Sequence, residues 1–318
     1  MSDGKKTPVA IFVFKRPQHT ARMLEALARN PELAELPLFI FCDGARREDE
    51  KAAVEATRSI VRDFAHPAKT VVERETNSGL AASIIEAVSN LCSNHGRVIV
   101  LEDDLVVSNG FLGFMLKALD RYENDPQVMQ VSGHAFPVES FGDTDPVLFL
   151  PFISSWGWAT WDRAWSAFDT KAEGWQALLL DRALARSFDI GGVYPYSAML
   201  AAQMEGRIDS WAIRWNWSVF RSQGCVVYPP VSLVTNVGFD GSGTHRSANA
   251  KFEAQSVADA ATITFLDPPS APDREDERFR LVQASVKAMQ GNPLKQFAKR
   301  LLWLYVRRRI LKSPVRGN

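Results

Sequence analysis

Arg97-Val-Ile-Val-Leu-Glu102-Asp103-Asp104-Leu105 is the stretch that decides the fold of this 318-residue chain. Its first half is a short, apolar, β-branched run, typical of a strand buried on both faces of a parallel sheet. Its second half places three consecutive carboxylates at the exposed end of that strand, where their repulsion is costly unless a cation or hydrogen-bond donors compensate it. Hard oxygen ligands of this kind suit Mg²⁺ or Mn²⁺ that in turn holds a diphosphate. The alternative is a polar loop, with an aspartate or Ser108 capping the next helix.

Similar apolar runs alternate with helix-like segments through the first half of the chain. The expected strands are 9–14, 38–41, 70–72, 98–101 and 128–131, and the helical segments between them are 17–27, 48–64, 79–91 and 111–122. Strands and helices that alternate at these lengths predict right-handed βαβ units. We therefore expect an α/β fold of the Rossmann-like kind, with a mostly parallel sheet covered by helices on both faces.

The second half of the chain loses this alternation. Helices are expected at 196–204, 211–220 and 275–289, and strands at 147–152, 226–228 and 232–234. The expected organisation is an N-terminal tail over 1–7, one α/β domain over 8–266, a linker and helix over 267–292, and a basic amphipathic helix over 293–318.

The composition excludes several classes of protein. With 46% hydrophobic and 23% charged residues, the chain is globular rather than disordered or collagen-like. Its 37 basic and 37 acidic residues give zero net charge, which argues against a dedicated nucleic-acid-binding protein. No G-x-G-x-x-G follows the first expected strand and no G-x-x-x-x-G-K-S/T occurs, which argues against dinucleotide dehydrogenases and P-loop enzymes.

The cysteines indicate a reducing environment. Cys42, Cys92 and Cys225 lie far apart and form no C-x-x-C pair, so we expect buried, reduced thiols. No secretory signal or membrane span is recognised, because the apolar run at 9–14 is too short for either. We therefore expect a cytoplasmic protein.

The zero net charge hides an uneven distribution. From Arg278 to the end the chain has 11 basic and no acidic residues, which leaves 26 basic and 37 acidic residues in 1–277. Apolar residues and cations in 294–312 follow the pattern of a basic amphipathic helix, and Trp303 adds an aromatic ring. Such a helix is expected to lie peripherally on an anionic membrane, here on its cytoplasmic face. Docking on an acidic flank of its own or another subunit is the alternative.

Ligands of open parallel sheets bind at the carboxyl ends of the strands. Arg16, Asp43 and the triplet Glu102-Asp103-Asp104 follow three of the expected strands. In this order, and with Trp156-Gly157-Trp158 and Trp165 downstream, the chain resembles GT-A-fold, metal-dependent glycosyltransferases, and most closely the N-acetylglucosaminyltransferase I family. The resemblance covers roughly residues 8–245, and its motifs are specific in combination rather than singly.

The resemblance implies roles for the acidic triplet and its neighbours. Asp104 would be the direct metal ligand, Asp103 would face the nucleotide ribose, and Glu102 would face the donor sugar. Asp43 would bond the pyrimidine base, and Arg16 would lie near the nucleotide. The alternative for Arg16, which is equally compatible with its residue type, is a solvent-exposed side chain at the end of the strand without a binding role.

Further roles follow from the same resemblance. Asn77 would contact the base or ribose, and Val237 and Gly238 would belong to a loop that closes over the donor. Asp209 falls on the catalytic base, although Ser210 replaces a second acidic residue of the family pattern and Ile208 replaces an aromatic one. Asp209 is equally a residue that caps the helix starting near Ser210.

Histidines and tryptophans supply secondary candidates. His245 follows a glycine-rich loop and is either a metal or phosphate ligand or an exposed loop residue. His134 is expected to be a satisfied structural side chain. Trp156 and Trp158 flank a glycine in a non-periodic stretch and are expected to stack on a sugar. The pairs Trp161/Trp165 and Trp211/Trp215 have the i, i+4 spacing of residues that pack a helix into a core.

These observations predict an inverting glycosyltransferase that uses a nucleoside-diphosphate sugar with Mn²⁺ or Mg²⁺, and the resemblance suggests UDP-N-acetylglucosamine as the donor. The expected acceptor is a hydroxyl of a glycan or of a lipid-linked saccharide, in the synthesis of a surface polysaccharide. A sugar-1-phosphate nucleotidyltransferase is the enzymatic alternative, although 15–18 lacks the glycine-rich basic loop that such enzymes carry. A non-catalytic, membrane-associated nucleotide-sugar-binding protein is the alternative of another class.

Overall fold

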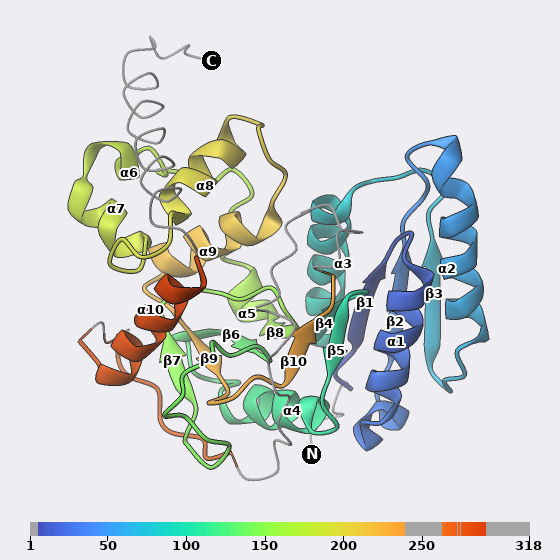
Figure 1. Ribbon diagram of the computed structural model, residues 1–318, viewed down its shortest axis with the longest axis horizontal. Coiled ribbons are helices and arrows are strands. Elements are labelled where there is room, and N and C mark those ends of the chain that lie inside the picture. Colours follow the sequence, from blue (N-terminus) through green and yellow to red (C-terminus); the bar gives the residue numbers. More distant parts are fainter. Residues whose placement is uncertain (1–5, 239–262, 272, 274, 291–318) are drawn as a thin grey trace.

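The computed structural model describes residues 6–238, 263–271, 273 and 275–290. In this part of the chain, an eight-stranded sheet has the order β3-β2-β1-β4-β8-β6-β9-β7 (Figure 1). Its strands are β1 (Val9–Val13), β2 (Leu38–Cys42), β3 (Lys69–Glu73), β4 (Arg97–Glu102), β6 (Val128–Ser132), β7 (Leu148–Leu150), β8 (Trp158–Trp161) and β9 (Cys225–Tyr228). A second, antiparallel sheet pairs β5 (Leu105–Val107) with β10 (Val234–Asn236).

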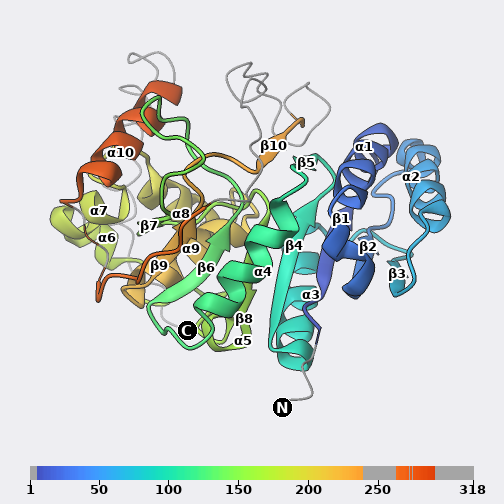
Figure 2. The same ribbon diagram turned by 90° about the horizontal axis from the view of Figure 1, so that it is seen from below.

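Helices surround the larger sheet. They are α1 (Pro17–Ala28), α2 (Lys51–Asp63), α3 (Leu80–His95), α4 (Phe111–Arg121), α5 (Asp162–Trp165), α6 (Ala177–Leu180), α7 (Arg182–Phe188), α8 (Tyr196–Met204), α9 (Trp211–Arg221) and α10 (Glu277–Met289), with 3-10 turns η1 (Pro31–Glu35) and η2 (Glu48–Glu50). Figure 2 shows α1 and α2 on one side of the parallel strands and α3 on the other.

The strand directions bring several strand ends to one edge. β3, β2, β1 and β4 are parallel neighbours, with Val9 of β1 in register with Leu38 of β2 and Ile99 of β4. β8 runs antiparallel between β4 and β6, β9 is parallel to β6, and β7 is antiparallel to β9. The prediction of an α/β fold with a mostly parallel sheet is therefore confirmed.

Burial explains why these runs form strands. All five residues of β1 and the four central residues of β4 are buried, as expected for strands that helices cover on both faces. The expected helix at 79–91 is also present as α3, and Ile84, Val88 and Leu91 lie in the core. Leu80, which the periodicity places on the same face, is 45% exposed because it is the first residue of the helix.

Two strands of the structure were not expected from the sequence. β8 is built from Trp158-Ala-Thr-Trp161, and all four residues are buried between β4 and β6. β5 has three residues and exists through its pairing with β10, which lies more than 100 residues later and is shifted from the expected 232–234. Both strands depend on partners that are distant in sequence, and periodicity within a short window cannot report such partners.

The tryptophans form a packed cluster that we call the tryptophan core: Trp158, Trp161, Trp165, Trp211 and Trp215. The expected core packing is confirmed, although within the pair Trp161/Trp165 only Trp165 lies on a helix, because Trp161 belongs to β8. The Trp158 side chain is completely buried, and its ring stacks on Trp211 with 4.8 Å between centroids. The expectation that Trp158 stacks on a sugar is corrected, because no face of its ring is accessible.

A second apolar cluster lies among α6, α7, α8 and α9 and includes Trp175, Phe188 and Leu200. Helix α9 contributes to both clusters, with Trp215 in the tryptophan core and Trp217 in the second cluster. Packing in both clusters therefore fixes the position of α9, and with it the position of the residues that immediately precede its first turn.

Several expectations lie partly or wholly outside the described residues. They are the basic helix over 293–318, most of the N-terminal tail, and His245. None of the helices in the described ranges is long and apolar enough to cross a bilayer. Cys42, Cys92 and Cys225 are buried free thiols, as expected, and burial raises the pKa of Cys42 and Cys225 to about 12.

Candidate functional site

The carboxyl ends of β1, β2 and β4 meet at one edge of the sheet, which we call the acidic edge: Arg16, Asp43, Glu102, Asp103 and Asp104. Arg16 Nη1 lies 2.8 Å from Asp104 Oδ2 and 3.6 Å from Asp103 Oδ1. The backbone N–H of Phe14 donates a hydrogen bond of 3.3 Å to Asp103 Oδ2. The structure thus brings Arg16 and the acidic triplet into one cluster, as the strand order predicts.

The carboxylates of this cluster are in an unfavourable environment. Burial and the neighbouring charge of Asp104 raise the pKa of Asp103 to about 7, against the opposing effects of Arg16 and the Phe14 N–H. Burial, followed by the charges of Asp104 and Asp103, raises the pKa of Glu102 well above its usual value. Among the described residues, the guanidinium of Arg16 lies beside the three carboxylates of the triplet Glu102-Asp103-Asp104 and offsets only part of their charge. This local excess of negative charge favours a bound cation.

The oxygen donors present fit a divalent cation only in part. Asp104 and Asp103 offer the hard oxygen ligands that Mg²⁺ and Mn²⁺ prefer. Within the described ranges, however, no group of three or more His, Cys, Asp or Glu side chains is gathered as a complete metal site. A cation at the acidic edge would therefore take its remaining ligands from a diphosphate or from water, as Mg²⁺ does in many phosphate sites.

The segment after β10 lies directly against Asp104. The Val237 N–H donates a 2.8 Å hydrogen bond to the backbone oxygen of Asp104, and the pairing of β5 with β10 sets up this contact. A side chain at Gly238 would clash, because a Cβ atom built there lies only 2.3 Å from Asp104 Oδ2. His19 Nε2 lies 3.3 Å from the backbone oxygen of Val237. Segments that are far apart in sequence thus form one wall, which we call the Gly238 wall, and the close approach at position 238 favours glycine.

Asp43 shapes the loop that precedes α3. Its Oδ1 accepts hydrogen bonds from the N–H groups of Gly44 and Ser78, both at 2.9 Å, and its Oδ2 accepts one of 3.0 Å from Gly79. Asn77 Nδ2 donates a 2.9 Å bond to the backbone oxygen of Gly44. Asp43 and Asn77 therefore lie together at the acidic edge, as expected, and both hold the 76–79 loop against the end of β2.

Asp209 lies next to this loop. Its side chain is 69% exposed, and its Oδ2 is 3.9 Å from the Cβ position of Gly79, whose φ of +82° requires glycine. Arg214 Nη2 lies 3.6 Å from Asp209 Oδ1. The N-cap of α9 is Ser210, whose hydroxyl oxygen accepts from the Ile213 N–H. Asp209 is therefore not the capping residue of α9, and its carboxylate is accessible to solvent beside the acidic edge.

A lysine–glutamate pair beside the acidic edge has no signal in the sequence. Lys15 Nζ lies 2.6 Å from Glu50 Oε1, and the Glu50 side chain is 5% exposed. Glu50 also accepts a hydrogen bond of 2.9 Å from the Arg46 N–H, so it anchors the loop after β2. This interaction joins the end of β1 to the start of α2, and only the folded chain brings the two together.

His134 has a structural position at the end of β6. Its side chain is 3% exposed and lies edge-on to Trp156, with 4.5 Å between ring centroids. Its Nδ1 is 3.4 Å from Ser154 Oγ, whereas Nε2 has no hydrogen-bond partner among the described residues. Burial lowers the pKa of His134 to about 3, so the ring is neutral at ordinary pH. The expectation that His134 is a structural side chain is confirmed, whereas the expectation that it is satisfied holds for only one of its two ring nitrogens.

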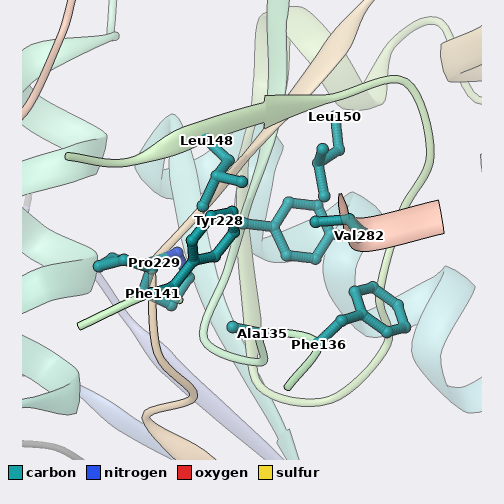
Figure 3. Close-up of a pocket in the computed structure, with 9 residues that line it drawn as sticks. Ala135, Phe136, Phe141, Leu148, Leu150, Tyr228, Pro229 and Val282 are labelled. Atoms are coloured by element: carbon teal, nitrogen blue, oxygen red, sulfur yellow. The ribbon is translucent and has the colours of Figure 1, made fainter. Parts of the chain in front are cut away.

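A small pocket elsewhere in the molecule has no charged lining. It lies between β7, β9 and α10 and is lined by apolar and aromatic side chains that include Phe136, Tyr228 and Val282 (Figure 3). It offers no groups for a phosphate or a cation. The acidic edge is therefore the candidate site.

No protein-family model and no curated protein sequence matches this chain. Among solved structures, S. aureus TarS 1–349 is similar with a TM-score of 0.41 and 14% identity, over 72% of this chain and 59% of TarS 1–349. The mannosyltransferase PcManGT from Pyrobaculum calidifontis, in complex with GDP-Man and Mn²⁺, has a TM-score of 0.34 and 14% identity, over 89% of this chain and 85% of that one. A cytidylyltransferase from Leptospira borgpetersenii has a TM-score of 0.34 and 13% identity, over 52% and 64%. Similarities this distant do not assign a function to the chain.

Proposed function

We propose that this protein is an inverting glycosyltransferase that moves a sugar from a nucleoside-diphosphate sugar to a hydroxyl group with the help of Mn²⁺ or Mg²⁺. The observation that supports this most strongly is the acidic edge, where three crowded carboxylates, Arg16 and the Gly238 wall meet at the carboxyl ends of parallel strands. This is the position at which open α/β sheets bind ligands. The resemblance to the N-acetylglucosaminyltransferase I family makes UDP-N-acetylglucosamine the first donor to test.

Asp104 would hold the cation, Asp103 would face the nucleotide ribose, and Glu102 would face the sugar. A bound divalent cation would stabilise the negative charge that develops on the departing diphosphate. Arg16 lies within reach of the same region and supplies a guanidinium that can bind phosphate oxygens. Asp43 and Asn77 hold the loop against which the base would lie.

Asp209 would be the general base. A base must reach the acceptor hydroxyl from the face of the sugar opposite the leaving group, and it must be open to an incoming acceptor. The 69% exposed carboxylate beside Gly79 meets the second requirement. Attack by the deprotonated hydroxyl on the face opposite the diphosphate inverts the anomeric configuration.

A thermal-shift screen of nucleotide sugars, with and without Mn²⁺, tests the proposed ligand class. We expect a metal-dependent rise in Tm with one or more nucleoside-diphosphate sugars, since ligands that bind only the folded state stabilise it. The Asp104→Ala variant should lose this rise. Stabilisation by a nucleoside triphosphate together with a sugar phosphate would instead favour the nucleotidyltransferase alternative. Binding without any turnover would favour the non-catalytic alternative.

We further propose that the acceptor is a glycan or a lipid-linked saccharide and that the basic segment 293–318 holds the protein on the cytoplasmic face of the membrane. The support is the charge pattern of that segment, which has no acidic residue. Sedimentation with anionic vesicles, before and after removal of 294–318, tests the membrane role. Unchanged binding after the truncation would contradict it.

A further inference from the structure

The guanidinium of Arg16 is placed where a cation would act on Asp104. Its Nη1 lies 2.8 Å from Asp104 Oδ2, and both side chains are largely buried, with exposed fractions of 16% and 17%. Arg16 follows β1 and occupies the N-cap position of α1, so its backbone is fixed by two elements. The same carboxylate oxygen is approached by Gly238, where a Cβ atom would lie at 2.3 Å. Asp104 is therefore already paired with Arg16.

A divalent cation bound to Asp104 and the guanidinium of Arg16 would repel each other. Mg²⁺ binds carboxylate oxygens at about 2.0–2.1 Å. A cation on Asp104 Oδ2 would therefore lie only a few ångströms from the positive charge of Arg16, and the two would repel each other strongly in a partly buried site. Cation binding is thus opposed until the guanidinium moves.

A diphosphate would offer the guanidinium of Arg16 alternative hydrogen-bond acceptors. Arginine binds phosphate oxygens through charge-assisted hydrogen bonds, which are stronger than neutral ones. A nucleoside diphosphate at the acidic edge would bring such oxygens next to Arg16. Once the guanidinium bonds to phosphate, Asp104 is released to bind the cation.

We propose that Arg16 is a built-in counter-ion of Asp104 that must be transferred to the diphosphate before the cation binds tightly, which couples cation binding to nucleotide binding. This inference rests on the proposed function, because it assumes the same cation and nucleotide. It assigns Arg16 a positioning role toward Asp104 in addition to any contact with the nucleotide.

The test measures Mn²⁺ affinity of the full-length protein in the absence of nucleotide, by electron paramagnetic resonance of free Mn²⁺. In the Arg16→Gln variant we expect Mn²⁺ to bind at least about fivefold more tightly than in the wild type, which is the lower end of usual coupling between two sites. UDP should then tighten Mn²⁺ binding less in this variant than in the wild type. Arg22→Gln is the matched control, since it removes one exposed charge from α1 without touching the acidic edge.

The possible outcomes are distinct. Equal or weaker Mn²⁺ binding by Arg16→Gln without nucleotide would overturn the inference and leave the proposed function intact. Failure of the wild type to bind Mn²⁺ even with UDP would overturn both. Should Arg16→Gln not fold, as judged by its Tm, Arg16→Met keeps the aliphatic stem and is expected to show the same tighter binding.

Discussion

The acidic edge and the tryptophan core are the two regions that stand out most in the sequence, and the fold gives them opposite characters. The tryptophan core is buried, uncharged and closely packed, with rings such as Trp158 and Trp211 stacked on each other. At the acidic edge the consecutive carboxylates of Glu102, Asp103 and Asp104 lie together, and burial, followed by their mutual repulsion, raises the pKa of Asp103 and Glu102. A cluster that lowers its own stability in this way points to ligand binding, whereas the aromatic cluster is explained by packing alone.

The comparison predicts that a change at the exposed carboxylate beside the acidic edge alters activity and leaves stability nearly unchanged. Replacing Asp209 by Asn should lower kcat by about 10²–10⁴-fold, the usual contribution of a general base. Its exposed side chain contributes little to packing, so Tm should stay nearly constant. Steady-state kinetics and a thermal melt of the same preparation measure both quantities. A product that retains the anomeric configuration of the donor, seen by NMR, would refute the role of Asp209.

The reverse is expected in the tryptophan core. Truncation of Trp158 to Ala should lower the free energy of unfolding by about 3–5 kcal/mol, because it removes a completely buried ring and leaves a cavity. Denaturant unfolding measures the loss, and Trp156→Ala is the control, because that ring is only half-buried. A loss below about 1 kcal/mol for Trp158 would contradict the packing role, since that is the ordinary effect of a mutation.

The buried His134 side chain makes the stability of the protein depend on pH. Its pKa is about 3 in the folded protein and near 6.5 when exposed, so the unfolded state binds the proton first as pH falls. Its contribution to stability is complete above about pH 6.5 and is lost between pH 6.5 and 3, by about 1.4 kcal/mol per pH unit. The difference between wild type and His134→Gln across this range isolates the effect. An unchanged difference between pH 7 and 5 would show that His134 is accessible to protons in the folded state.

The smallest expected effect is on the free energy of unfolding, and it distinguishes the helix-capping role of Ser210 from the role of Asp209. Ser210→Ala removes the N-cap of α9 and should lower the free energy of unfolding by about 1 kcal/mol. Asp209→Ala should not produce this loss, because its carboxylate does not cap the helix. Equal losses in the two variants, measured by denaturant unfolding, would return Asp209 to a structural role.

Much of the parallel sheet is predictable from the sequence, because buried parallel strands are continuous apolar runs. Strands such as β1 and β4 fall within one or two residues of their expected bounds. β8 and β5 are not predictable in this way, because their partners are distant in sequence. The same limit explains the error at Trp158, since an aromatic residue in a non-periodic stretch has no local sign of burial.

The candidate site shows the same division. The meeting of Arg16 and the acidic triplet follows from strand order alone, because parallel strands end at one edge. The contact of Gly238 with Asp104 and the Lys15–Glu50 pair depend on how loops pack, which the sequence pattern does not reveal.

The start of α9 is also not predictable to a single residue. Asp209 and Ser210 are both good capping residues by type, and only the folded backbone shows that Ser210 is the N-cap.

The central claim is that the acidic edge holds a cation and a nucleoside-diphosphate sugar for catalysis. The most direct test is the release of UDP from UDP-N-acetylglucosamine and other UDP-sugars by the purified protein, with Mn²⁺, with Mg²⁺ and with a chelator. We predict metal-dependent release with at least one donor, reduced by about 10²–10³-fold in Asp104→Ala protein that a thermal melt shows to be folded. Release that persists in Asp104→Ala at the wild-type rate would contradict the account.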